Sequence, residues 1–129
     1  MVTTLPIQNL HLEYKLWIAE LNFDNEMMKI FESHLENILM QNQEKKDRLP
    51  QVEHFQNQFI RQREVIDELK HHLNISEKQL AGFTREMSPI GYEFERLDNH
   101  PHLRDQFLTF RKIFNELKEE FHDFEASCM

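Results

Sequence analysis

The sequence predicts an all-α protein, and three observations carry this prediction. Apolar residues recur in alternating steps of three and four through most of the chain, which places them on one stripe of an α-helix. No segment shows the sustained apolar–polar alternation that is typical of a strand. The 129 residues include only two Gly and four Pro, which disfavours a fold that needs many tight turns.

We expect a single domain over residues 1–129, built as an antiparallel up-down-up bundle of long helices with coiled-coil-like heptads. The first helix is predicted over residues 7–43, where the apolar stripe is continuous. The polar run QEKKDRL then forms a loop, and a second helix follows over residues 50–87. Pro50 suits the start of that helix, because the first helical position does not need its N–H group.

The third helix is predicted in two pieces, over residues 90–98 and 101–126, with a break near Pro101. The apolar register slips at that point, and Asn99 or His100 could cap the second piece. An alternative keeps the second helix going past Pro89 as one long rod, with the last helix folding back along half of it.

The charge balance disfavours two classes of partner. With 15 Lys and Arg against 23 Asp and Glu, the net charge is −8, the wrong sign for binding nucleic acid or an anionic membrane surface. We see no secretory signal and no apolar run of the length that a membrane helix needs. The single cysteine, Cys128, cannot form an internal disulfide and fits a reducing compartment. We therefore expect a cytoplasmic protein.

The first helix carries more apolar surface than one core-facing stripe requires. Leu16, Phe23, Met27 and Ile30 lie on a face that adjoins the main stripe. Large apolar patches rarely stay exposed, so we expect this face to bind a second copy of the chain or another protein. The alternative is internal cover, with residues 90–97 lying across the first helix.

Polar residues occupy four positions of the core stripes: Asp24, Asn42, Gln62 and Ser76. Asn42 lies at a helix end, where we expect it to be solvated. Asp24 lies in mid-helix and needs a partner if it is buried. Counting back from the predicted turns places Lys70 and Arg111 near it, which predicts a buried salt bridge that sets the helix register.

Two Glu-x-x-His pairs raise the question of a metal site, because di-iron bundles use this spacing. Glu68 with His71 and Glu119 with His122 have the spacing, but the apolar stripes turn both pairs outward. Ligands that diverge cannot share an ion, so we predict solvated faces and no metal site. Without glycine-rich loops or a nucleophile motif, we also predict no catalytic residues and no cofactor.

Three stretches resemble a group of bacterial conserved hypothetical proteins that are all-helical and carry no assigned activity. They are LEYKLW (residues 12–17), VEHFQNQFI (52–60) and VIDELKH (65–71). The resemblance implies a helical fold and transfers no site residue. From the sequence we expect a non-enzymatic helical interaction or structural protein that forms a homodimer through the first helix. A metal-binding bundle that uses Glu and His residues is the alternative.

Overall fold

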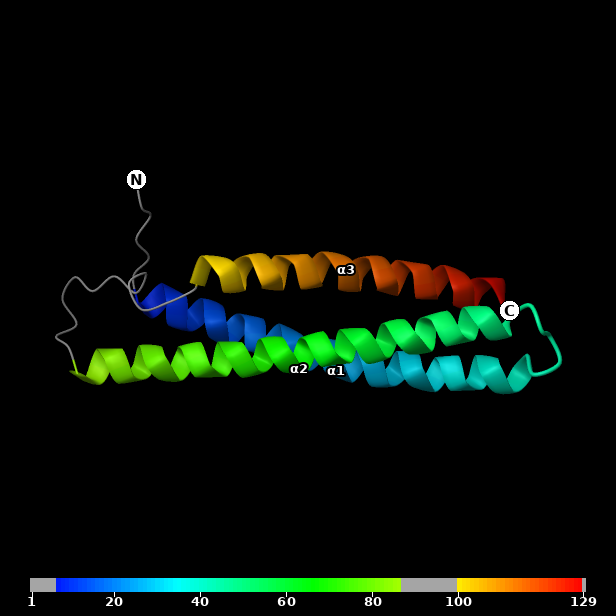
Figure 1. The fold of residues 1–129 in the computed structure, drawn as a ribbon, viewed down its shortest axis with the longest axis horizontal. Coiled ribbons are helices and arrows are strands. Elements are labelled where there is room, and N and C mark those ends of the chain that lie inside the picture. The colour runs from blue at the N-terminus through cyan, green and yellow to red at the C-terminus, as the bar shows by residue number, and fades with distance from the viewer. Residues whose placement is uncertain (1–6, 87–99, 129) are drawn as a thin grey trace.

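The structure, a computed structural model, describes residues 7–86 and 100–128. These residues form three helices, α1 (Ile7–Gln41), α2 (Leu49–Glu86) and α3 (His100–Ser127), which lie side by side as an elongated bundle (Figure 1). The described part of the chain contains no strand. The prediction of an all-α helical bundle is confirmed.

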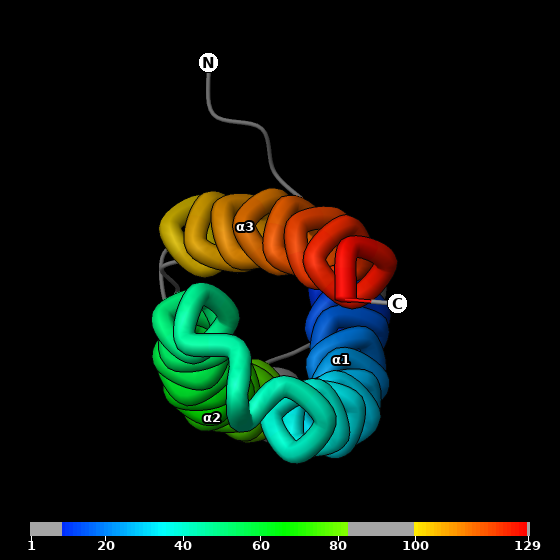
Figure 2. The backbone as a smooth tube through the Cα atoms, turned by 90° about the vertical axis from the view of Figure 1, so that its right-hand side faces the viewer, coloured from blue at the N-terminus to red at the C-terminus, as the bar shows by residue number. Residues whose placement is uncertain are grey.

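Interhelical ion pairs define the direction of each helix. Those between α1 and α3 join residues that lie 91 positions apart, so these two helices run the same way. Between α1 and α2, His11 faces Glu77 while Glu32 faces Arg63, so α2 runs in the opposite direction. Viewed down the bundle, the three helices surround a common axis (Figure 2).

The turn between α1 and α2 begins at a buried polar residue. The side chain of Asn42 donates a hydrogen bond of 2.8 Å to the carbonyl oxygen of Ile38. The expectation of a solvated Asn42 is therefore wrong, because its amide folds back on the last turn of the helix and becomes buried. α1 consequently ends at Gln41, two residues before the predicted end, and α2 begins at Leu49, one residue before Pro50.

The last helix begins at His100, so Pro101 lies in its first turn, where a missing N–H group is tolerated. The helix agrees with the predicted range 101–126 to within one residue at each end. The predicted piece over residues 90–98, the break that separates it from this helix, and the alternative rod past Pro89 all lie outside the described residues.

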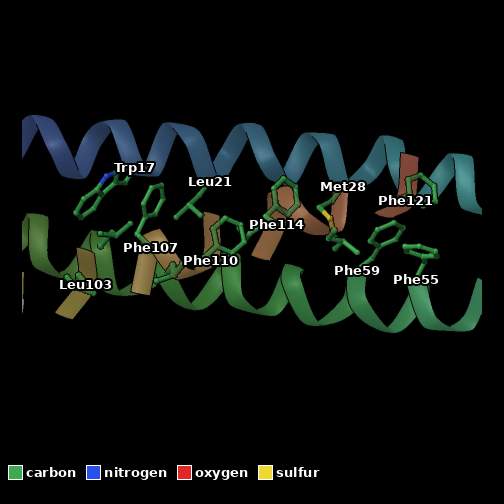
Figure 3. Packing of buried hydrophobic residues seen from close by; sticks show 14 of the residues in the cluster. Trp17, Leu21, Met28, Phe55, Phe59, Leu103, Phe107, Phe110, Phe114 and Phe121 are labelled. Atoms are coloured by element: carbon green, nitrogen blue, oxygen red, sulfur yellow. The ribbon is translucent and has the colours of Figure 1, made fainter. Parts of the chain in front are cut away.

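Apolar side chains from all three helices fill the centre of the bundle (Figure 3). α1 contributes Leu10, Tyr14, Trp17, Leu21, Met28, Leu35 and Ile38. α2 contributes Val52, Phe55, Phe59, Ile66, Leu69, Leu73 and Leu80. α3 contributes Leu103, Phe107, Phe110, Phe114, Leu117, Phe121 and Phe124. Each set follows the steps of three and four that predicted the helices.

Aromatic rings join the helices at both ends of the core (Figure 3). Towards the start of α3, the ring of Phe107 stacks on Trp17 with a centroid separation of 5.1 Å. Towards the other end, Phe121 lies 5.4 Å from Phe55 and 5.2 Å from Phe59. Rings in tilted and stacked arrangements stabilise a core beyond the area that they bury. The aromatic residues of α3 therefore hold this helix against the other two.

Candidate interaction surface

An apolar stripe remains exposed along the outside of α1. Leu16, Phe23 and Ile30 keep 60%, 64% and 56% of their surface exposed, and each follows the previous one by seven residues. Seven residues are close to two helical turns, so the three side chains lie along one line of the helix. Leu12, one turn before Leu16, is also exposed and extends the stripe towards the start of the helix. We call these four residues the α1 stripe.

Met27, the fourth residue predicted on this face, does not belong to the α1 stripe. Its side chain is half-buried and packs against the hydrophobic core. Met27 lies seven residues after Glu20, which binds α3, so it occupies the row of α1 that faces that helix. Helical periodicity alone placed Met27 on the outer face, because the sequence does not show how far α3 extends around α1.

A row of ion pairs joins α1 to α3 beside the α1 stripe. Glu13 accepts hydrogen bonds of 3.0 and 2.7 Å from Nε and Nη2 of Arg104. Glu20 accepts bonds of 2.8 and 2.9 Å from Nε and Nη2 of Arg111. Paired guanidinium–carboxylate bonds of this kind fix geometry as well as contributing energy.

The same row continues towards the end of the bundle. His34 lies 2.6 Å from a carboxylate oxygen of Glu125, again 91 residues away. Between the second and last pairs, the register places Met27 opposite Lys118. Four levels thus follow one another at seven-residue spacing, and we call them the α1–α3 ladder. They are Glu13 with Arg104, Glu20 with Arg111, Met27 with Lys118, and His34 with Glu125. Only one of its levels lacks a carboxylate.

Asp24 is buried, as expected, but the predicted salt bridge is wrong. Only 6% of its surface is exposed, and it makes no hydrogen bond or ion pair with another described residue. Arg111 binds Glu20 instead, one turn earlier. Desolvation by burial is the main cause that raises the pKa of Asp24 from 3.8 to about 6, and Glu20 acts in the same direction, whereas Lys118 and Arg111 oppose the rise.

Lys70 lies on a different side of α2 from the one that a salt bridge with Asp24 requires. It follows Arg63 by seven residues and precedes Glu77 by seven, and both of those residues face α1 from the side of α2. Lys70 therefore lies on the flank of α2 that faces α1, and it is not among the charges that act on the pKa of Asp24. Counting residues from the turns placed Lys70 and Asp24 at the same level along the bundle, but it could not show which side of α2 carries Lys70.

His100 forms a buried polar contact that the sequence analysis missed. Its Nδ1 lies 3.1 Å from the hydroxyl oxygen of Tyr14, and its ring stacks on Trp17 with an interplanar angle of 12°. Nη2 of Arg104 lies 3.3 Å from Nε2 on the other edge of the ring. Because His100 precedes Phe107 by seven residues, the core stripe of α3 extends back to it, and that spacing was the available signal. The contact anchors the start of α3 to α1.

The Glu-x-x-His residues do not converge. Glu68, His71, Glu119 and His122 are all exposed, on the outward faces that the stripes predicted. Among the described residues, no three His, Cys, Asp or Glu side chains are placed to hold a metal ion. These positions therefore form part of the solvated surface.

A groove of about 420 Å³ runs between α2 and α3. Gln62, the buried polar residue on the stripe of α2, lines it together with His72 and His102. Arg61 lies on its walls together with Glu68 and Asp105, so the groove mixes charges of both signs. It has no concentrated charge that would select an anion or a cation.

Comparisons with known proteins give no relative. No family model matches the chain, and neither the curated proteins nor the solved structures provide a match. The similarity to the bacterial hypothetical group stays a prediction. No described helix is long and apolar enough to cross a membrane. The geometry of the described residues is therefore the basis for a functional proposal.

Proposed function

We propose that this protein is a non-enzymatic interaction module that self-associates through the α1 stripe. The observation that carries the proposal is the exposure of Leu16, Phe23 and Ile30 in one line on a helix whose opposite side already fills the core. Burying these side chains against a partner removes apolar surface from water, worth roughly 25 cal/mol for each Å². A second copy of the chain is the simplest partner, since most soluble oligomers are symmetric homo-oligomers.

Other exposed apolar residues support the choice of α1. Ile60 and Ile75 on α2 are exposed singly, which is ordinary for a soluble surface. The four residues of the α1 stripe instead adjoin one another along the helix. Leu108 on α3 is also exposed and lies one turn from Arg104 and Arg111, on the α3 side of the ladder. The apolar surface thus gathers on both sides of the α1–α3 ladder.

Light scattering coupled to size-exclusion chromatography, at two well-separated protein concentrations, tests the proposal. We expect a mass near twice 15.8 kDa for the native chain and a shift to monomer when Phe23→Ser and Ile30→Ser are combined. Ile60→Ser is the matched control, because it removes an equally exposed isoleucine from α2. A native chain that stays at 15.8 kDa, or a double variant that associates unchanged, would overturn self-association through this stripe.

The metal-binding alternative has a separate test. Elemental analysis of protein purified without a histidine tag would revive it if a transition metal were found near one equivalent per chain.

We also propose that the protein works in a reducing compartment such as the cytoplasm, which its lone Cys128 fits.

A further inference from the structure

We propose that the groove between α2 and α3 binds an extended peptide of about five residues. The groove lies away from the α1 stripe, so this inference does not rest on self-association. Its volume of about 420 Å³ is within the range of ligand sites in proteins. The residues that line it lie within 61–72 of α2 and 102–113 of α3. Each stretch is about 16 Å long, which an extended chain covers with about five residues.

Two glutamine side chains in this groove lack a hydrogen-bond partner. Only 5% of Gln62 is exposed, and its amide makes no hydrogen bond with another described residue. Its amide atoms are not fully covered, so they remain open to the groove. The side-chain oxygen of Gln106 is covered and also has no partner in the described part of the chain. Gln106 is itself only half-buried, so its amide can turn towards the groove that it lines.

Unpaired amides of this kind are uncommon in folded proteins. Buried polar groups are almost always hydrogen-bonded, because an unpaired one loses the bonds that it makes with water when the chain is unfolded. Gln62 occupies the core stripe of α2, where an apolar side chain would avoid that loss. A ligand that enters the groove can supply the bonds that Gln62 and Gln106 lack.

The two glutamines lie near opposite ends of the groove. The rings of Phe55 and Phe124 lie 5.0 Å apart and those of Phe59 and Phe121 lie 5.2 Å apart, so α2 and α3 run antiparallel. In this register the glutamine of α3 lies level with a position about 11 residues after the glutamine of α2, or about 16 Å along the groove. A compact molecule cannot pair with both amides. A peptide main chain can, because it carries an N–H and a C=O group at nearly every residue.

The middle of the groove suits apolar side chains. Leu69 and Phe110 are buried beneath it, and Val65 and Ile113 remain partly exposed along it. Alternate side chains of an extended peptide point to the same side, so every second one contacts this apolar surface. A helical peptide fits less well, because its backbone groups bond to one another and leave few for the glutamines.

The charges along the groove favour an uncharged peptide. Arg61, Glu68 and Asp105 have opposite signs, so no field of a single sign extends along the groove. We therefore expect a peptide with apolar residues at alternate positions and little dependence of its affinity on salt.

Nuclear magnetic resonance with the full chain and a defined peptide tests the site. The probe is a five-residue peptide of alternating leucine and serine, capped at both ends so that it carries no charge. We expect it to shift the side-chain amide signals of Gln62 and Gln106 and the methyl signals of Val65 and Leu69. The control peptide has the same side chains and methylated backbone nitrogens, which removes its N–H donors. It should bind roughly 2- to 10-fold more weakly.

Gln62→Leu separates binding from folding. Leucine has a similar size and needs no hydrogen-bond partner, so this variant should unfold at a higher temperature than the native chain. It should also bind the probe roughly 2- to 10-fold more weakly, as should Gln106→Leu. Gln79→Leu, at an exposed position of α2 outside the groove, is the matched control and should change neither property.

Four results would overturn the proposal. Groove signals that do not shift at millimolar peptide would show that the peptide does not bind there. Shifts confined to Phe23 and its neighbours would assign peptide binding to the α1 stripe. Equal affinities of the two peptides would exclude main-chain recognition. A Gln62→Leu chain that is less stable than the native chain would mean that Gln62 already has a partner in the free bundle. Self-association is measured separately by mass, so its failure leaves this proposal standing.

Discussion

Asp24 illustrates how a single residue can work against the stability of its own fold. It occupies a core position on α1 between Leu21 and Met28, both of which are fully buried. Ionising a carboxyl group there costs free energy, because burial removes water from it and the charges of Lys118 and Arg111 compensate only in part. Its pKa of about 6 expresses that cost. Between about pH 4 and 6 the folded chain holds a proton that the unfolded chain has released, so stability falls as the pH rises through this range.

Asp24→Asn should therefore stabilise the bundle at pH 7.5. The neutral amide has nearly the same shape, and removing the charge should raise the free energy of unfolding by about 1–3 kcal/mol, up to the full cost of the pKa shift. Urea unfolding at pH 7.5 and pH 4 measures the effect, which should shrink at the lower pH. Asp67→Asn, at an exposed position of α2, is the control. A destabilised Asp24→Asn chain at pH 7.5 would mean that the carboxylate has a stabilising partner.

At the scale of one helix, α3 is attached to the bundle by rings on its inner face and charges on its flank. Phe121 contacts Phe31 of α1 as well as Phe55 and Phe59 of α2, so one side chain joins all three helices. The ladder residues lie at the edge of this contact and remain partly exposed. We expect the rings to contribute most of the stability and the charges to set the register.

Phe121→Ala should lower the free energy of unfolding by about 3–5 kcal/mol, since it empties a site between three helices. Urea denaturation followed by circular dichroism measures the loss. Leu108→Ala, on the exposed side of α3, should change stability by less than about 0.5 kcal/mol. Should the alanine chain fail to fold, Phe121→Leu provides a milder loss at the same position. Equal effects of Phe121→Ala and Leu108→Ala would contradict the packing.

The pair of Glu20 and Arg111 should show a smaller coupling. A double-mutant cycle with Glu20→Ala and Arg111→Ala should give about 0.5–1 kcal/mol, because both side chains remain partly in water. The coupling should decrease at high salt, where exposed charges are screened. The same cycle on Lys29 and Glu26, an exposed pair within α1, provides a weaker reference. A coupling above about 3 kcal/mol would indicate a desolvated pair.

At the scale of the whole molecule, the bundle has one helix with two apolar faces. α1 buries one face against α2 and α3 and leaves the stripe through Phe23 in solvent. An exposed line of large apolar residues lowers the solubility of an isolated bundle, whereas association gives those residues a partner. Folding and association are then linked through the concentration of the protein.

Linkage predicts that thermal stability depends on concentration. For the native chain, the midpoint of thermal unfolding should rise over a hundredfold increase in protein concentration, because mass action favours the associated folded state. The chain with both Phe23→Ser and Ile30→Ser should have a midpoint that does not change. Differential scanning fluorimetry over that range measures both. A constant midpoint for the native chain would contradict a dimer that assembles in this range.

Much of the fold could be predicted from local patterns. The steps of three and four placed Trp17, Phe59 and Phe114 on inward faces, and all three are buried. The outward orientation of Leu16 and Phe23 followed from the same periodicity, because which residues share one side of a helix depends only on the helical repeat. The helix ends were less exact. The side-chain bond of Asn42 and the position of His100 depend on neighbouring groups that a periodic pattern does not contain.

The amino-acid order alone therefore settled which segments are helical and which side of each helix is apolar, since both depend on residues a few positions apart. The tertiary structure decided which rows of side chains on neighbouring helices contact one another. Arg111 binds Glu20 rather than Asp24, and Met27 faces α3 rather than solvent, because the packing of large rings sets the offset and the rotation of each helix. If a helix shifts by one turn along its axis, or rotates by one row of side chains, every one of its residues contacts a different partner. Counting residues along the sequence measures neither the shift nor the rotation.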